Sequence, residues 1–264
     1  ADEKRVDIRI EAAMGKLFCT EATWKITDMT MQLRGGRGYE SARSLKARGE
    51  PPYPVERAMR DVRINTILEG SSEIMRLFLA REAMDPHLQR LSGLLSKKAS
   101  VGAKIKTALG LVGHYSWWYP AQLVKSLFSS SYSELGPLAA QFKFIEKTSH
   151  QLAGSIFYYM AVYQQGLEKR QLLVGHLMEI GTELFAMAAT CSYAHSLWNN
   201  NKDDQSAIEL AKHFCLLSRR RIAGHFDALS DNDDRSGNKV ADRVLNGDCR
   251  WLEQGIVWIG PKDL

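Results

Sequence analysis

The stretch PVERAMRDVRINTILEGSSEI, residues 54–74, holds the pattern that decides how this chain folds. From Val55 to Leu68 its apolar residues recur with the three- and four-residue spacing of a helix. Glu69, Gly70 and two serines then interrupt that spacing, and serine is a favourable N-cap for a new helix. The stretch therefore predicts two helices joined by a short turn that contains Glu69.

Helical spacing continues on both sides of this turn. Downstream, the new helix is expected to begin at Ser71 or Ser72 and to run to about Met84. Pro86 then allows a further helix to start, because proline is tolerated in the first turn of a helix. Upstream, apolar residues recur over residues 7–34, which predicts one long helix that ends at a glycine cluster.

The rest of the chain also reads as helical. Three long helices and a shorter one are expected over residues 138–165, 168–199, 203–229 and 240–252. The sequence contains no alternating strand pattern of convincing length, so we predict an all-α fold of two helical bundles. The first bundle is expected over residues 1–90, and an accessory helical domain over residues 135–264. A connector is expected between them, over residues 91–134.

Composition excludes several classes of protein. At 264 residues, with 45% hydrophobic and 25% charged residues, the chain matches soluble globular proteins. No run of about 18 uncharged apolar residues occurs, so no transmembrane helix is expected. The charged start ADEKR does not resemble a signal peptide and is typical of a cut through a longer protein. The four scattered cysteines predict a reducing compartment and neither a disulfide framework nor a metal site.

Positive charge is concentrated in the predicted connector. The net charge is +5, yet the stretch from Pro86 to Ser133 contains six lysines and arginines and no acidic residue. Residues 117–119 (Trp-Trp-Tyr) lie near Lys125 and resemble an interfacial membrane anchor, although they could equally pack between the domains. The three arginines at residues 219–221 are typical of a solvated helix face, so no nucleic-acid partner is expected.

Two segments carry the chemical signal. In QLRGGRGY, residues 32–39, the glycines follow a helix rather than a strand, which argues against a dinucleotide-binding fold. They could be a simple helix end, or a turn whose backbone N–H groups approach an anion such as pyrophosphate. Glu69 could be a solvated glutamate. Its position between an apolar run and a helix start also suits a general base, because desolvation favours proton uptake.

Together these segments resemble the C-terminal signature of the acyl-CoA dehydrogenase family. Its members show Gln-x-x-Gly-Gly-x-Gly-Tyr, then Pro-Val-Glu-Arg, Arg-Asp-x-Arg-Ile and an aromatic-Glu-Gly-Thr/Ser-Ser-Glu-Ile run that ends in Ala-Arg. The match covers about residues 8–85. The chain is similar to the C-terminal part of a larger, long-chain or very-long-chain member that carries an extra helical domain.

The resemblance implies FAD-dependent α,β-dehydrogenation of acyl-CoA thioesters, with long-chain ones expected, to trans-2-enoyl-CoA in fatty-acid β-oxidation. Glu69 would remove the α-proton while the β-hydrogen leaves as hydride to the flavin. Gly70 and Leu68 would contact the substrate, and Leu68 stands where the family often has an aromatic residue. Cofactor contacts are implied for Ser71, Ser72 and Glu73 beside the flavin, and for Gln32, Leu33, Arg34, Gly35 and Gly36 at the ADP part of a neighbouring subunit's FAD.

The resemblance also implies partners and a location. A homodimer or higher homo-oligomer, an acyl-CoA substrate and a flavoprotein electron acceptor are expected. The location would be the bacterial cytoplasm, with peripheral membrane contact in some members, or the mitochondrial matrix in a eukaryote. The chain by itself is expected to be inactive, because it lacks the other parts of a flavin pocket. The alternative is a non-catalytic assembly or docking protein, which would have no use for Glu69.

Overall fold

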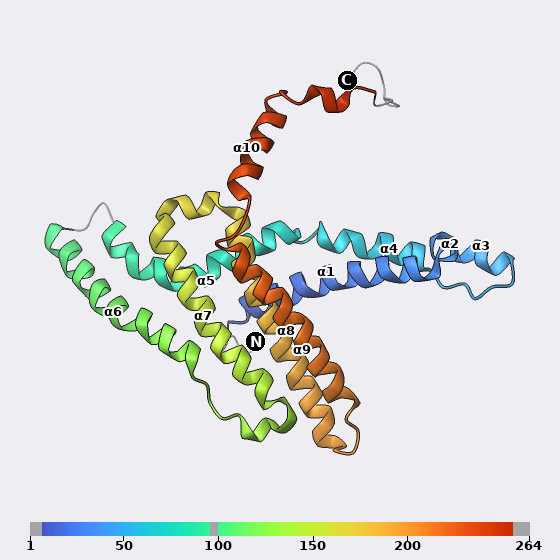
Figure 1. The fold of residues 1–264 in the computed structure, drawn as a ribbon, viewed down its shortest axis with the longest axis horizontal. Coiled ribbons are helices and arrows are strands. Elements are labelled where there is room, and N and C mark those ends of the chain that lie inside the picture. Colours follow the sequence, from blue (N-terminus) through green and yellow to red (C-terminus); the bar gives the residue numbers. More distant parts are fainter. Residues whose placement is uncertain (1–6, 96–99, 256–264) are drawn as a thin grey trace. The chain divides into compact units, whose positions relative to one another are not determined.

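The computed structural model describes residues 7–95 and 100–255, and these residues contain helices and no strand. The predicted all-α fold is confirmed (Figure 1). The chain divides into two compact units, Ala1–Leu229 and the smaller Ser230–Leu264. The catalytic and cofactor residues predicted from the sequence all lie in the first unit.

The first helices carry the predicted site. They are α1 (Arg9–Arg34), α2 (Gly36–Tyr39), α3 (Ala42–Ala47), α4 (Val55–Arg63), the 3-10 helix η1 (Ile64–Thr66) and α5 (Ser72–Leu95). Helices α1 and α4 lie side by side, and the short helices α2 and α3 follow the end of α1 (Figure 1). The long helix predicted over residues 7–34 is confirmed, as is the helix start beside Ser71.

The later helices complete both units. In the first unit they are α6 (Val101–Leu127), η2 (Ser133–Leu138), α7 (Ala139–Tyr163), η3 (Gln164–Lys169), α8 (Gln171–Asn200) and α9 (Ser206–Ala228). Helix α8 packs against α1, α5, α7 and α9, so it is the central helix of this unit (Figure 1). The second unit contains α10 (Asp234–Leu245) and η4 (Arg250–Glu253), and α10 begins earlier than predicted because acidic residues suit a helix N-terminus.

Two local predictions were wrong. Pro86 does not begin a new helix but lies inside α5, which continues to Leu95 because its packing on α1 and α8 compensates for the lost backbone hydrogen bond. Most of the predicted connector is the 27-residue helix α6. Its glycines lower helix propensity by about 1 kcal/mol each, but α6 packs along α7, where the rings of Tyr115 and Phe157 stack with centroids 4.4 Å apart.

One hydrophobic core spans both predicted bundles. Ala13 and Leu17 from α1 and Leu79 from α5 belong to the same buried cluster as Ile180 and Met187 from α8. Side chains of α9 complete this cluster. The predicted domain boundaries at residues 90 and 134 therefore do not appear as gaps in the packing of the first unit.

Helix α8 corresponds to the helix expected over residues 168–199 and is strongly apolar. Within the described parts of the chain it is the one helix that could cross a membrane by length and composition. However, 56% of its apolar window is buried inside the structure. Such burial is typical of the core helix of a folded domain.

Candidate catalytic turn and glycine turn

The predicted catalytic base lies on a left-handed turn between η1 and α5. Glu69 has φ +53° and Gly70 has φ +93°, so both residues occupy a region of backbone space that L side chains rarely adopt. Glycine is favoured at the second position because a φ of +93° is strained for any L side chain, and a Cβ there would also lie 2.6 Å from the Sδ atom of Met75, which would have to shift. A non-glycine residue held at positive φ costs about 1–3 kcal/mol and is often found at functional sites.

The surface beside this turn is apolar and open. Leu68 is 57% exposed, and its neighbours Ile67 and Ile74 are exposed as well. Glu69 itself is exposed, so the desolvation expected from its sequence neighbours is absent from this chain. Large exposed apolar side chains around a carboxylate indicate a surface that another protein segment or an apolar ligand covers.

The start of α5 matches the predicted cap. The backbone N–H of Ile74 donates to the Ser71 hydroxyl oxygen over 3.4 Å, which confirms Ser71 as the capping residue. The pKa of Glu73 lies below its ordinary value, first because its carboxylate accepts a hydrogen bond from its own backbone N–H, and second because of a hydrogen bond with Ser71. Ser72 is buried, and its hydroxyl has no hydrogen-bond partner.

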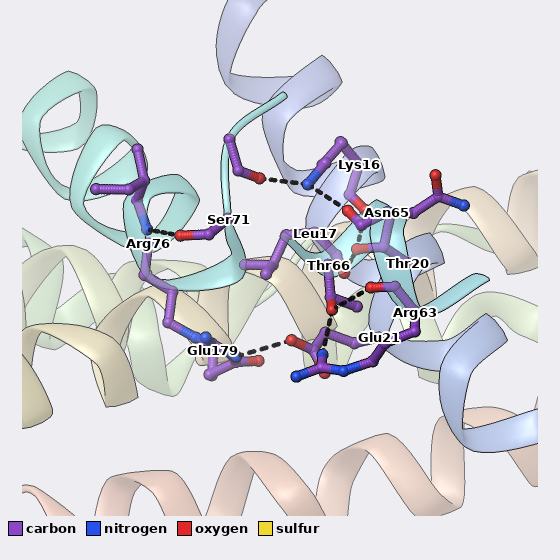
Figure 2. Close-up of polar contacts among 12 residues, drawn as sticks. Lys16, Leu17, Thr20, Glu21, Arg63, Asn65, Thr66, Ser71, Arg76 and Glu179 are labelled. Carbon is purple, nitrogen blue, oxygen red and sulfur yellow. Dashed lines mark hydrogen bonds and ion pairs between the residues drawn. The ribbon is translucent and has the colours of Figure 1, made fainter. Parts of the chain in front are cut away.

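Helix α1 holds the turn through a residue that the sequence did not single out. The Nζ atom of Lys16 donates to the backbone oxygen of Asn65 over 2.9 Å and to that of Gly70. Figure 2 shows Lys16 pointing from α1 toward Asn65. The two acceptors lie on either side of Glu69, 49 and 54 residues further along the chain than Lys16, so no local spacing could have indicated this contact.

Two of the arginines before the turn form ion pairs on the surface of α4. Arg57 pairs with Asp61 over 3.4 Å, and Arg60 pairs with Glu56 one helical turn earlier. Both pairs follow the i,i+4 spacing of a helix surface. Arg63 makes a different set of contacts.

Arg63 donates to the hydroxyl of the buried Thr66, and its guanidinium lies 5.3 Å from the ring centroid of Trp24 on α1. These contacts join the end of α4 to η1 and to α1. An open hollow of about 330 Å³ lies there, lined by Trp24, Met59, Arg60, Arg63, Ile64 and Ile67. The hollow adjoins the catalytic turn through its two isoleucines.

The glycine turn lies at the other end of α1. Gly35 has φ +57° and ψ −142°, a conformation that only glycine adopts readily, and it ends the helix as predicted. Nothing lies within 4 Å of where a Cβ would stand on Gly35 or Gly36, so a ligand could approach this backbone closely. Gly38, by contrast, is buried, and a Cβ on it would lie 2.6 Å from the backbone oxygen of Met31.

The neighbours of this turn are mostly exposed. Gln32 is exposed, and Leu33 is 87% exposed. The guanidinium of Arg34 lies 5.0 Å from the ring centroid of Tyr53, which keeps a positive charge beside the open glycines. This combination of open backbone and a nearby cation suits an anionic ligand.

The predicted site residues form two groups rather than one. A helix rises about 1.5 Å per residue, so roughly 28 Å of α1 separates Lys16, beside the catalytic turn, from Gly35. The two groups are too far apart to touch the same reacting atom. No group of three or more metal-binding side chains occurs within the part of the chain that the structure describes.

Comparisons with known proteins agree with these motifs. Residues 1–84 match the family described as acyl-CoA dehydrogenase, C-terminal domain. A probable acyl-CoA dehydrogenase of Mycobacterium tuberculosis, FadE10, is 45% identical over 259 residues, which cover 97% of this chain and 40% of that protein. The human mitochondrial very long-chain specific acyl-CoA dehydrogenase is 29% identical over 243 residues, covering 88% of this chain and 34% of that protein.

A solved structure supports the fold. An acyl-CoA dehydrogenase from Bacillus anthracis, crystallised with FAD, aligns with a TM-score of 0.55 and 22% identity over 82% of this chain and 32% of that one. The predicted resemblance is thus confirmed: residues 1–84 match the acyl-CoA dehydrogenase C-terminal domain family. The chain corresponds to the C-terminal part of larger members and spans 40% of the length of its mycobacterial relative.

Proposed function

We propose that this chain supplies the catalytic base of an FAD-dependent acyl-CoA dehydrogenase. The observation that carries the proposal is Glu69, held on a left-handed turn beside exposed apolar side chains in a segment that matches the family. In the proposed reaction, the Glu69 carboxylate takes the α-proton of the acyl thioester. Covering the apolar surface around the turn would exclude water from the site of this proton transfer.

The residues present fit the proposed cofactor. Gly35 and Gly36 offer open backbone, and Arg34 lies beside them, so this turn would hold an anionic part of FAD. Ser71, Ser72 and Glu73 would lie beside the flavin at a helix N-terminus. FAD, when bound, supplies the two-electron acceptor for the substrate's β-hydrogen.

A homo-oligomer follows from the separation of the two groups. Because the glycine turn lies roughly 28 Å along α1 from the catalytic turn, we propose that it serves the FAD of a neighbouring subunit. The fully exposed position of Leu33 fits such an arrangement, since an exposed leucine at the end of a helix is suited to be covered by a partner.

The proposed substrates are long-chain acyl-CoA thioesters, and a flavoprotein would accept the electrons. The long-chain preference rests on similarity to a relative whose name specifies very long chains, along a region that includes the later helices. We place the protein in the cytoplasm of a bacterium, or in the mitochondrial matrix of a eukaryote. Assays of the full-length protein would determine its chain-length preference and its electron acceptor.

Peripheral membrane contact is a second proposal, and it rests on helix α6. Its side chains Leu109, Val112 and Trp117 are between 67% and 79% exposed, while Lys106 and Lys125 on the same helix are basic. Exposed apolar and basic side chains together suit an anionic lipid surface. Lys97 and Lys98, which also belong to the basic stretch from Pro86 to Ser133, lie outside the described residues.

The isolated 264-residue chain should be inactive and should bind FAD poorly, because Glu69 and the apolar residues beside it stand open to solvent. A yellow, active preparation of this chain alone would contradict that expectation. The rival function, a non-catalytic docking protein, predicts that the full-length protein is also inactive.

A dehydrogenase assay on the full-length protein tests the proposal. Turnover would be measured over a series of acyl-CoA chain lengths for the wild type, Glu69→Gln and Glu168→Gln. Glu168 is an exposed glutamate of η3, and its replacement should leave turnover unchanged. We expect activity that peaks at long chains and falls at least about 100-fold in Glu69→Gln. Retained activity in Glu69→Gln would remove this residue from the mechanism.

A further inference from the structure

The turn that carries Glu69 is short of hydrogen bonds from its own backbone. The hydrogen bonds of η1 end where the N–H of Leu68 donates to the oxygen of Ile64. Those of α5 begin where the N–H of Met75 donates to the oxygen of Ser71. Glu69 lies between these two points at positive φ, a conformation that other contacts must maintain.

Lys16 provides such contacts on both sides of Glu69. Its ammonium donates to the oxygen of Asn65, four residues before Glu69, over 2.9 Å, and to the oxygen of Gly70, directly after it. One ammonium group has three donors, so it can hold two carbonyl groups at once. A hydrogen bond to a charged group contributes more to stability than one between neutral groups.

The helix that carries Lys16 is itself firmly placed. Lys16 is half-buried, and the next residue, Leu17, is 1% exposed in the core shared by α1, α5 and α8. Ala13, one turn earlier, belongs to the same core. The stem of the lysine therefore starts from a firmly packed helix, and its head reaches the segment that carries Glu69 (Figure 2).

We propose that Lys16 is a positioning residue for the catalytic base: its ammonium binds the carbonyl groups of Asn65 and Gly70 and so fixes the backbone from which Glu69 projects. The inference rests on the proposed role of Glu69. Lys16 touches neither substrate nor cofactor in this account. It acts by keeping the carboxylate where proton transfer can occur, because a small displacement of a catalytic group slows a reaction steeply.

The test measures proton abstraction separately from turnover in the full-length, FAD-loaded protein. A 3-thia-acyl-CoA has an α-proton but no β-hydrogen, so exchange of its α-proton into D₂O reports the base alone. The exchange rate, followed by NMR, and the dissociation constant of this analogue would be measured for each variant. The variants are Lys16→Met, Lys16→Arg, Lys16→Gln, the control Lys25→Met and Glu69→Gln.

We expect Lys16→Met to slow exchange about tenfold or more while the dissociation constant changes less than about threefold. Lys16→Arg, which keeps a cation with several donors, should restore most of the rate. Lys25→Met should leave it unchanged, since Lys25 is an exposed lysine of the same helix. This split between binding and exchange, with rescue by arginine, is not expected from a general loss of stability.

Two results would overturn the inference, and they differ. Wild-type exchange in Lys16→Met, with exchange lost in Glu69→Gln, removes Lys16 alone. Unchanged exchange in Glu69→Gln removes the proposed base and the inference with it. If Lys16→Met does not fold, Lys16→Gln decides: its amide is uncharged and its side chain is shorter, so it does not replace the ammonium, and an exchange rate equal to the wild type would also contradict the proposal.

Discussion

Arg76 on α5 donates from its Nε atom to Oε1 of Glu179 on α8 over a distance of 2.6 Å. The pair joins the catalytic segment to the accessory helices, and a second acceptor, Glu21 on α1, lies 3.8 Å from Arg76 (Figure 2). Arg76 lies one helical turn after the start of α5, so the contact braces the helix that begins at the catalytic turn.

Breaking this pair should lower stability. Both side chains are about one-quarter exposed, so we expect Arg76→Gln to reduce the free energy of unfolding by about 1–2 kcal/mol. Urea unfolding measures the change, and a double-mutant cycle with Glu179→Gln isolates the coupling. Arg57→Gln is the control, because the exposed Arg57–Asp61 pair should contribute less than about 0.5 kcal/mol. Equal effects of the two arginine replacements would contradict this account.

Gly70→Ala should destabilise the turn. The added Cβ meets Met75 at 2.6 Å and the backbone stands at φ +93°, so a loss of about 1–3 kcal/mol is expected, together with reduced dehydrogenase activity. Gly110→Ala on α6 has open space, and it should be neutral or stabilise by up to about 1 kcal/mol. Thermal unfolding compares the two, and wild-type stability in Gly70→Ala would argue against a strained turn.

The shared core predicts a contrast between two leucines of the same helix. Leu17 is 1% exposed in the core, so Leu17→Ala should cost about 2–5 kcal/mol. Leu33 is 87% exposed, and Leu33→Ala should change stability by less than about 0.5 kcal/mol in the 264-residue chain. Circular dichroism and tryptophan fluorescence should give one coincident transition for the first unit. Two separated transitions would indicate independent bundles.

Histidine burial predicts a pH dependence of stability. Burial lowers the pKa of His225 on α9, which lies 3.0 Å from His176 between their Nδ1 atoms. A group whose pKa is lower in the folded state takes up protons more readily when unfolded. Its contribution to stability is therefore present above pH of about 6.5 and is lost as the pH falls below that value.

The free energy of unfolding, measured from pH 7.5 down to pH 5, should accordingly fall. The fall should be shallower in His225→Gln, while the exposed His213 on the same helix provides the control variant His213→Gln. An identical pH dependence in His225→Gln and the wild type would assign the effect to other groups. His87 contributes in the same direction, since burial lowers its pKa as well.

Membrane contact through α6 predicts binding to anionic vesicles. The protein should sediment together with liposomes that contain phosphatidylserine. Replacing Lys97, Lys98, Lys104 and Lys106 by glutamine should weaken this binding. High salt should weaken it too, because the attraction is partly electrostatic. Absence of binding, or binding that is indifferent to the lysine replacements, would exclude this role.

Features that depend on neighbouring residues, such as helices and their caps, could be predicted from the sequence. The periodicity over α1 and the serine beside the catalytic turn placed the helix and the cap correctly, because both depend on neighbouring residues. The contacts of Lys16 with Gly70 and of Arg76 with Glu179 join residues 54 and 103 positions apart, so no local pattern carries them. The glycines of α6 suggested a connector, but packing against α7 outweighs their low helix propensity.

The role of Glu69 can be tested by one measurement: anaerobic reduction of the full-length flavoprotein by a long-chain acyl-CoA, followed as bleaching of the flavin's visible absorption. The account predicts rapid bleaching in the wild type and in Glu168→Gln, and a rate at least about 100-fold lower in Glu69→Gln. Bleaching of Glu69→Gln at the wild-type rate would contradict it, because the α-proton would then leave to another group.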